Sequence, residues 1–121
     1  MGIEKLLGKT LASINIDREQ NEIRFTDTNG VNYRMFHIQD CCEEVTIDDI
    51  EGDINDLIGA PITMAEQMCN TEDKMGKADD YVESFTWTFY KLATIKGYVT
   101  IKWWGESNGY YSEEVCFVQE N

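Results

Sequence analysis

The sequence predicts an α+β fold, in which an antiparallel-dominated sheet of about six or seven strands accompanies a short acidic helical insert. Apolar and polar residues alternate in two regions, one near each end of the chain, as they do in strands with one buried face. Between these regions, apolar residues recur at spacings of three and four, which is typical of a helix. Because the turns between the strands are too short for parallel crossovers, we expect two antiparallel meanders around the insert.

The first meander is predicted before residue 40. Ile23 and Phe25 alternate with polar residues, and Asn29-Gly30 is a signal for a tight hairpin turn. The predicted elements are a short helical turn around Ile3 to Leu7 and three strands, over Leu11 to Ile16, Glu22 to Thr26 and Val31 to Ile38.

The helical insert is predicted from Cys41 to Gly59. Gly52 interrupts its apolar pattern, and Gly59 followed by Pro61 ends it. On this interpretation the acidic residues cover the face of the insert that contacts water. The residues with helical spacing are Ile47, Ile50, Ile54, Leu57 and Ile58.

The second meander is predicted near the end of the chain. An extended segment, Ile62 to Met68, comes before it, and the polar run Asn70 to Asp80 is expected to be a loop. Lys96-Gly97 and Asn108-Gly109 supply the turns. The three predicted strands are marked by Phe85, Trp87 and Phe89, by Val99, Ile101 and Trp103, and by Val115 and Phe117.

The length and composition suit one domain over residues 1–121, because 42% hydrophobic residues suffice for one core. No apolar run approaches the roughly 20 residues of a membrane span, and the start lacks the apolar stretch of a signal peptide. We therefore expect a cytoplasmic protein. In that compartment the cysteines are expected to be reduced thiols or metal ligands rather than disulfides; they are Cys41, Cys42, Cys69 and Cys116.

The negative charge is concentrated in one part of the chain. The net charge is -13, and eleven Asp and Glu residues lie between Arg34 and Lys74 without any Lys or Arg. Such a charge repels nucleic acids and anionic membranes, so direct binding to either is disfavoured. A calcium loop is disfavoured as well, because Ile50 occupies the place of an oxygen ligand. A basic partner, another cation or plain solubility remain as explanations.

His37 lies close to an adjacent pair of cysteines, Cys41 and Cys42. Imidazole and thiolates are zinc ligands, so these residues are candidates for a structural zinc site whose fourth ligand would come from elsewhere. Asp40, a carboxylate of the insert, Cys69 or Cys116 could supply it. The alternative is that no metal binds, one cysteine packs in the core and His37 is half-buried.

No sequence motif of an enzyme is present: there is no Gly-x-Ser-x-Gly, phosphate-binding glycine loop or His-Glu-x-x-His. Cys41 or Cys42 acting as a nucleophile with His37 as base is disfavoured, since proximity in sequence does not establish geometry. We therefore expect no enzymatic activity.

Two tandem aromatic pairs, Trp103-Trp104 and Tyr110-Tyr111, flank the turn at 105–109. Adjacent residues of a strand point to opposite faces, so one residue of each pair is expected in the core and the other half-exposed. The exposed ones could stack on a base or anchor a protein partner. If the sheet is covered on both faces, both residues simply pack.

Four segments of the sequence form a specific combination: Met35 to Glu43, Asp56 to Ile62, Thr86 to Tyr90 and Gly105 to Ser112. Together they resemble a family of small proteins of unassigned function from bacteriophage and prophage genomes, and the resemblance covers nearly the whole chain. The family has no assigned activity or functional residues. The resemblance implies a phage origin, and small acidic phage proteins without catalytic motifs are similar to anti-defence proteins, such as anti-CRISPR inhibitors and proteins that sequester nucleotide signals.

Our leading hypothesis from the sequence is a stoichiometric inhibitor that acts in the host bacterial cytoplasm. Its acidic surface would dock on a basic host defence protein, such as a CRISPR effector nuclease, whose nucleic-acid channel is positively charged. The alternative is a nucleotide-binding protein in which Trp104 and Tyr110 stack on a base while Lys102, Lys91, Lys96 or Arg34 meets the phosphate. The partner-binding residues of the leading hypothesis are Asp40, Glu43, Glu44, Asp48, Asp49, Glu51, Asp53 and Asp56.

Overall fold

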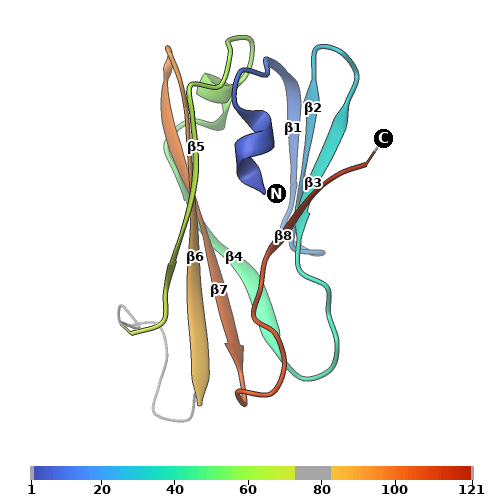
Figure 1. The fold of residues 1–121 in the computed structure, drawn as a ribbon, viewed down its shortest axis with the longest axis vertical. Helices are drawn as coiled ribbons and strands as arrows, with labels where there is room; N and C mark the ends of the chain where they lie inside the picture. Colours follow the sequence, from blue (N-terminus) through green and yellow to red (C-terminus); the bar gives the residue numbers. More distant parts are fainter. Residues whose placement is uncertain (1, 73–82, 121) are drawn as a thin grey trace.

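The computed structural model describes residues 2–72 and 83–120 (Figure 1). Most of the predicted loop from Asn70 to Asp80 lies outside these residues. No helix in the described ranges is long and apolar enough to span a membrane. The elements are η1 (Ile3–Leu6), β1 (Leu11–Asp17), β2 (Glu22–Asp27), β3 (Asn32–Phe36), β4 (Glu44–Glu51), η2 (Ile54–Leu57), β5 (Met64–Asn70), β6 (Ser84–Thr94), β7 (Gly97–Ser107) and β8 (Cys116–Gln119).

The strands form two sheets of four, with the orders β1-β2-β3-β8 and β4-β7-β6-β5, and every pair of neighbouring strands is antiparallel. The sheets pack face to face, and the 3-10 helix η1 lies between β1 and β5 (Figure 1). Ile3 and Leu6 of η1 are buried in the shared core. The first meander and the β6–β7 hairpin thus form as predicted from their alternating patterns.

The prediction of an α+β fold with a helical insert is wrong. Strands account for 57% of the structure and helix for 7%, and the central segment forms strand β4 followed by the short 3-10 helix η2. The cause is a β-bulge between Ile47 and Asp49. Ile47 pairs with Trp103 and Ile50 with Ile101, so two residues on one face are three positions apart on β4 but two on β7. This spacing imitates a helical period.

The last strand belongs to a different sheet from the predicted one. Val115 and Phe117 suggested a third strand of the second meander, but β8 pairs with β3 of the first sheet, with Met35 opposite Phe117. Residues 108–115 therefore cross from one sheet to the other. Gly105 accommodates this segment, because a side chain there would approach the Cβ of Glu113 to 3.0 Å.

The core lies between the two sheets. Trp103 of β7 is fully buried, and its indole N–H donates to the sulfur of Met35 on β3 at 3.2 Å. Trp104 points to the opposite face of its sheet, where it is only 3% exposed and packs against Phe85 and Trp87. Both members of the tryptophan pair are therefore buried, contrary to the expectation that one is half-exposed.

We expect Gly52→Ala to destabilise the turn that follows β4. Gly52 has a φ of +101°, and an added Cβ would lie 2.6 Å from the carbonyl oxygen of Tyr98. Gly8→Ala is the control, since Gly8 has a φ of +81° but nothing within 4 Å of its Cβ position. The control should lose about 1–2 kcal/mol of unfolding free energy from its backbone conformation, and Gly52→Ala about 1–3 kcal/mol more from the steric overlap. Equal losses in urea denaturation would contradict the contact.

Candidate functional site

The candidate site combines two neighbouring features. One is the β3–β4 connection, residues 37–43, where the chain crosses from the first sheet to the second. The other is the acidic edge, which we define as the carboxylates of β4 and of the turn and helix after it. The acidic edge comprises Glu44, Asp48, Asp49 and Glu51 of β4 with Asp53 and Asp56.

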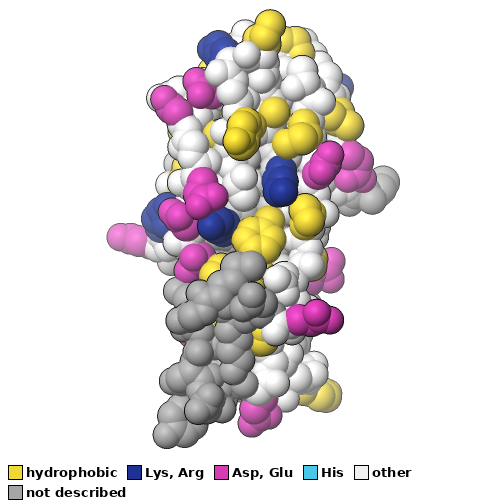
Figure 2. Space-filling model, turned by 90° about the vertical axis from the view of Figure 1, so that its left-hand side faces the viewer, with side chains coloured by type: hydrophobic (Ala, Val, Ile, Leu, Met, Phe, Trp, Pro, Cys, Tyr) yellow, Lys and Arg dark blue, Asp and Glu magenta, His cyan; other side chains and the backbone are white. Residues whose placement is uncertain are grey.

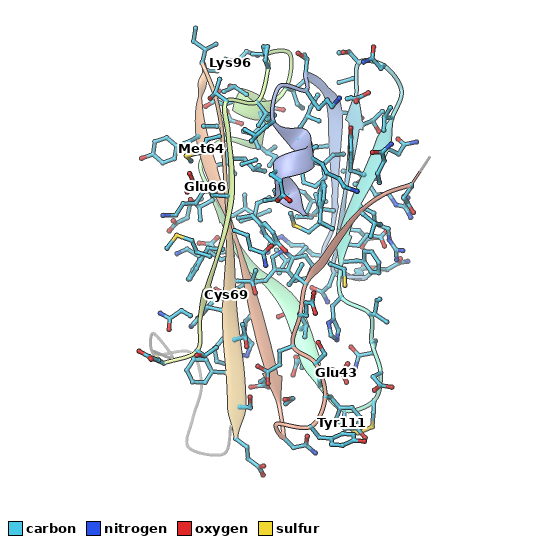
Figure 3. All side chains as sticks on the ribbon, in the orientation of Figure 1. Glu43, Met64, Glu66, Cys69, Lys96 and Tyr111 are labelled. Carbon is cyan, nitrogen blue, oxygen red and sulfur yellow. A yellow bond between two sulfur atoms is a disulfide. The ribbon has the colours of Figure 1, made fainter. Side chains whose placement is uncertain are left out.

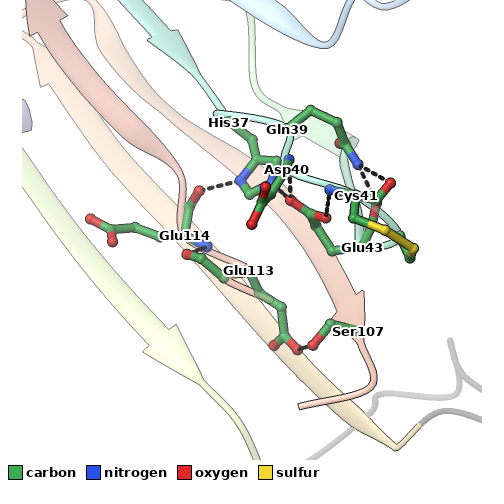
Figure 4. Close-up of polar contacts among 10 residues, drawn as sticks. His37, Gln39, Asp40, Cys41, Glu43, Ser107, Glu113 and Glu114 are labelled. Atoms are coloured by element: carbon green, nitrogen blue, oxygen red, sulfur yellow. Dashed lines mark hydrogen bonds and ion pairs between the residues drawn. A yellow bond between two sulfur atoms is a disulfide. The ribbon is translucent and has the colours of Figure 1, made fainter. Parts of the chain in front are cut away.

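Glu43 is the central residue of the β3–β4 connection, although it was predicted to contact a partner. Its side chain has no exposed surface. One carboxylate oxygen accepts the backbone N–H of Cys41 at 2.9 Å, and the other accepts the backbone N–H of Asp40 at 2.8 Å (Figure 4). These donors, led by the Cys41 N–H and assisted by His37, lower the pKa of Glu43 to about 2 against the opposing effect of burial. Glu43 therefore holds the connection in place and does not belong to the exposed acidic surface.

His37 links the β3–β4 connection to residues 108–115, the segment that crosses from the second sheet back to the first. Its side chain is 4% exposed; Nε2 lies 2.8 Å from a carboxylate oxygen of Glu43, and Nδ1 lies 2.6 Å from the carbonyl oxygen of Glu114 (Figure 4). A carbonyl and a carboxylate are hydrogen-bond acceptors, so each ring nitrogen of His37 faces an acceptor. The imidazole therefore bridges the buried carboxylate of Glu43 and the backbone carbonyl of Glu114.

Two further residues, Gln39 and Glu113, fix the same region, and neither was among the predicted site residues. The side-chain amide of Gln39 donates to the carbonyl oxygens of Glu43 at 2.8 Å and Cys41 at 3.3 Å. Glu113 accepts a hydrogen bond from Thr86 at 2.7 Å. It accepts another from Ser107 (Figure 4), and the two bonds anchor the segment that presents the Glu114 carbonyl. Gln39 lies within the segment 35–43 that contributes to the family resemblance, whereas no sequence signal pointed to Glu113.

Cys41 and Cys42 are joined in a disulfide, whereas the sequence analysis expected them to be reduced. Cys69 and Cys116 are free thiols. Zinc binds thiolates, so the bonded pair supplies no zinc ligand in this form. Among the residues that the structure describes, no three His, Cys, Asp or Glu side chains are grouped so as to hold a metal ion. Zinc binding by His37, Cys41 and Cys42 stays a prediction for the reduced protein, which elemental analysis tests.

A crevice of about 300 Å³ opens beside the β3–β4 connection, and His37, Asp40 and Cys116 are among the residues that line it. Burial raises the pKa of the Cys116 thiol. This favours the neutral thiol over the nucleophilic thiolate. His37 and the Cys116 thiol thus line the same crevice, but the neutral thiol is a poor nucleophile.

The acidic edge lies at one margin of the second sheet, since β4 is an outer strand. Glu51 forms an ion pair with Lys102, whose Nζ lies 2.9 Å from a carboxylate oxygen of Glu51. Glu44, Asp49 and Asp53 are exposed and form no ion pair with another described residue. Asp53 also caps η2, because its carboxylate accepts the N–H of Asn55 at 3.0 Å. A row of carboxylates with one lysine therefore faces solvent, together with the exposed Asp40 next to it.

The residues of the predicted nucleotide site do not converge. Trp104 is buried, whereas Tyr110 is 82% exposed and contacts Tyr111 edge to face. Lys102 instead lines a shallow groove of about 710 Å³ with Lys91 and Phe89. The groove lies on the outer face of the second sheet; Figure 2, which views the molecule from the side of β5 and β6, shows lysines, carboxylates and apolar side chains intermixed there.

We expect the Glu43 carboxyl to titrate near pH 2 in the folded protein, against about 4.5 for an ordinary glutamate. Because its folded pKa is lowered, its contribution to stability is complete above pH 4.5 and is lost as the pH falls toward 2. Carboxyl ¹³C NMR measures the midpoint directly.

In urea unfolding, the stability difference between the wild type and Glu43→Gln should be largest near neutral pH and shrink on acidification. Glu44→Gln, at the exposed neighbouring position, is the control and should show no such dependence. A Glu43 titration midpoint above 4 would contradict the assignment.

Comparison with curated proteins and with solved structures found no significant match. The family profile described as a domain of unknown function, DUF7448, matches residues 4–117. This range begins within η1, includes the β3–β4 connection and the acidic edge, and ends within β8. The chain therefore belongs to the DUF7448 family.

Proposed function

We propose that this protein is a non-catalytic binding protein whose acidic edge docks on a positively charged protein surface. The observation that carries the proposal is the position of the carboxylates on an outer strand. Glu44 and Asp49 lie well apart along β4, and Asp49 and Glu51 are alternate residues, which lie about 6.6–6.8 Å apart in a strand, so the carboxylates form a row along the edge rather than a compact chelating cluster. Such a row suits several basic side chains better than one cation.

The internal contacts of the other acidic residues support this assignment. Glu22 pairs with Arg24 and Arg34 at 2.8 and 2.9 Å. Glu43 pairs with His37, and Asp27 accepts backbone N–H groups of its own turn. The carboxylates of Glu22 and Glu43 have basic partners within the fold, whereas Glu44, Asp49 and Asp53 have none among the described residues. Within the described chain, Asp49 and Asp53 each accept only a backbone N–H from a residue close to them in the sequence. The negative potential is therefore directed outward at the acidic edge.

We further propose that the target is a nucleic-acid-targeting protein of a bacterial host, such as a CRISPR effector nuclease. This step rests on the resemblance to phage proteins, with which an anti-defence role is consistent. Nucleases of this type hold nucleic acid in basic channels, so they present surfaces complementary to carboxylates. The net charge of -13 opposes direct binding to DNA, RNA or anionic lipid.

The test compares two variants that remove three charges each. The edge variant carries Glu44→Gln, Asp49→Asn and Asp53→Asn, and the control carries Glu19→Gln, Glu66→Gln and Glu83→Gln at exposed positions elsewhere. Both change the net charge from -13 to -10, since three negative charges are removed. In pull-downs from bacterial lysate, we expect the wild type and the control to retain a nucleic-acid-binding protein that the edge variant loses.

The captured protein then allows a kinetic check. We expect the edge variant to associate about 10-fold or more slowly than the control at low salt, with the difference shrinking at high salt, because screening weakens long-range attraction. Identical binding by both variants at two salt concentrations would overturn the proposal. Stabilisation of the protein by a nucleotide in that case would favour the small-molecule alternative at the groove of Lys91 and Lys102.

A further inference from the structure

Each of the two sheets has two outer strands, and three of these four edges carry features that prevent pairing with another strand. Strand β1 has a bulge between Leu11 and Ser13, and Leu11 bridges to Ile58. Strand β8 is only four residues long. Strand β4 has both a bulge and the acidic edge.

Strand β5 has no bulge and no row of charges, and η1, which packs beside it, forms no backbone hydrogen bond with residues 64–69 in the described chain. Its seven residues pair with β6 in unbroken register from Met64 to Asn70, and Glu66 is its single charged residue. Met68 is 50% exposed. In Figure 3, Met64 points away from the first sheet while Glu66 and Cys69 follow along the same outer strand.

The backbone of β5 is also available for pairing. Between Met64 and Cys69, no backbone N–H or C=O group on the side away from β6 bonds to another described residue. The hydrogen bonds that join the N-terminal segment to this part of the chain are made earlier, by Gly8 and Lys9 with Ile62. A regular, nearly uncharged edge of this length is a template for an added strand.

We infer that β5 pairs with β5 of a second copy of this chain in antiparallel orientation, so that two four-stranded sheets join into one of eight strands. When residues Met64–Asn70 of one copy pair with the same residues of the other over their full length, the two-fold axis passes through Gln67. In that register Glu66 of one copy faces Met68 of the other, and the two glutamates do not face each other. The strand is therefore self-complementary, as a symmetric dimer requires.

The distribution of charge permits this contact despite the net charge of -13. The sheet order β4-β7-β6-β5 puts the acidic edge at the opposite margin from β5. Three strand spacings, or about 14 Å, separate the two margins, which exceeds the Debye length at physiological salt. The acidic edges of the two copies would lie at the far ends of the joined sheet.

Reciprocal charge variants at Gln67 test both the dimer and its register. Gln67→Lys and Gln67→Glu should each sediment at the monomer mass of 14.0 kDa, because identical charges would face each other across the axis. The wild type, and an equimolar mixture of the two variants, should sediment at twice that mass. Asn15→Lys on the exposed edge of β1 is the control and should remain dimeric.

Cross-linking provides the second measurement. In a Cys69→Ser background, Gln67→Cys should form a disulfide-linked dimer under mild oxidation, since directly opposed Cβ atoms lie about 4.5–5.5 Å apart. Asn15→Cys in the same background should not. A wild type that stays monomeric at sub-millimolar concentration, or equal cross-linking of both variants, would overturn the inference and leave β5 as an edge for an extended peptide from another protein.

Discussion

The imidazole of His37 joins the two chain segments that cross between the sheets, residues 37–43 after β3 and 108–115 after β7. One ring nitrogen contacts the buried carboxylate of the first crossing, and the other contacts the Glu114 carbonyl of the second. A buried carboxylate is costly unless its oxygens are satisfied, and here two backbone N–H groups and His37 satisfy them. The position of β4, and therefore of the acidic edge, depends on this arrangement.

The alternating patterns were sufficient to predict the first meander and the β6–β7 hairpin, because no bulge interrupts the β2–β3 pairing or the β6–β7 pairing. The sequence could not reveal that Asp48 is the extra residue of a bulge, since a spacing of three on one face of β4 equals one turn of a helix. Nor could periodicity assign β8 to a sheet. It marks which face of a strand is buried, but it carries no information about which strand lies beside it.

The candidate site was predictable only in part for a similar reason. Glu43 and Glu44 are adjacent and chemically alike, so from the sequence both were predicted to bind a partner. Their different environments arise from contacts with His37, with two backbone N–H groups and with a segment more than 70 residues away in the chain, since His37 and Glu114 are separated by 77 positions. An acidic stretch can thus combine structural carboxylates with exposed ones, and tertiary contacts separate the two kinds.

The late position of β8 has a consequence for how the chain folds. Phe36 pairs with Cys116, so the first sheet is completed by a contact between residues 80 positions apart. The entropy of closing a loop rises with its length, and contacts of this range slow folding relative to local hairpins. The first meander and the β6–β7 hairpin can form locally, whereas β3 must wait for the last strand to be synthesised. Until then β3 is an open edge, and the four residues of β8 both protect it and bring Glu114 within reach of His37.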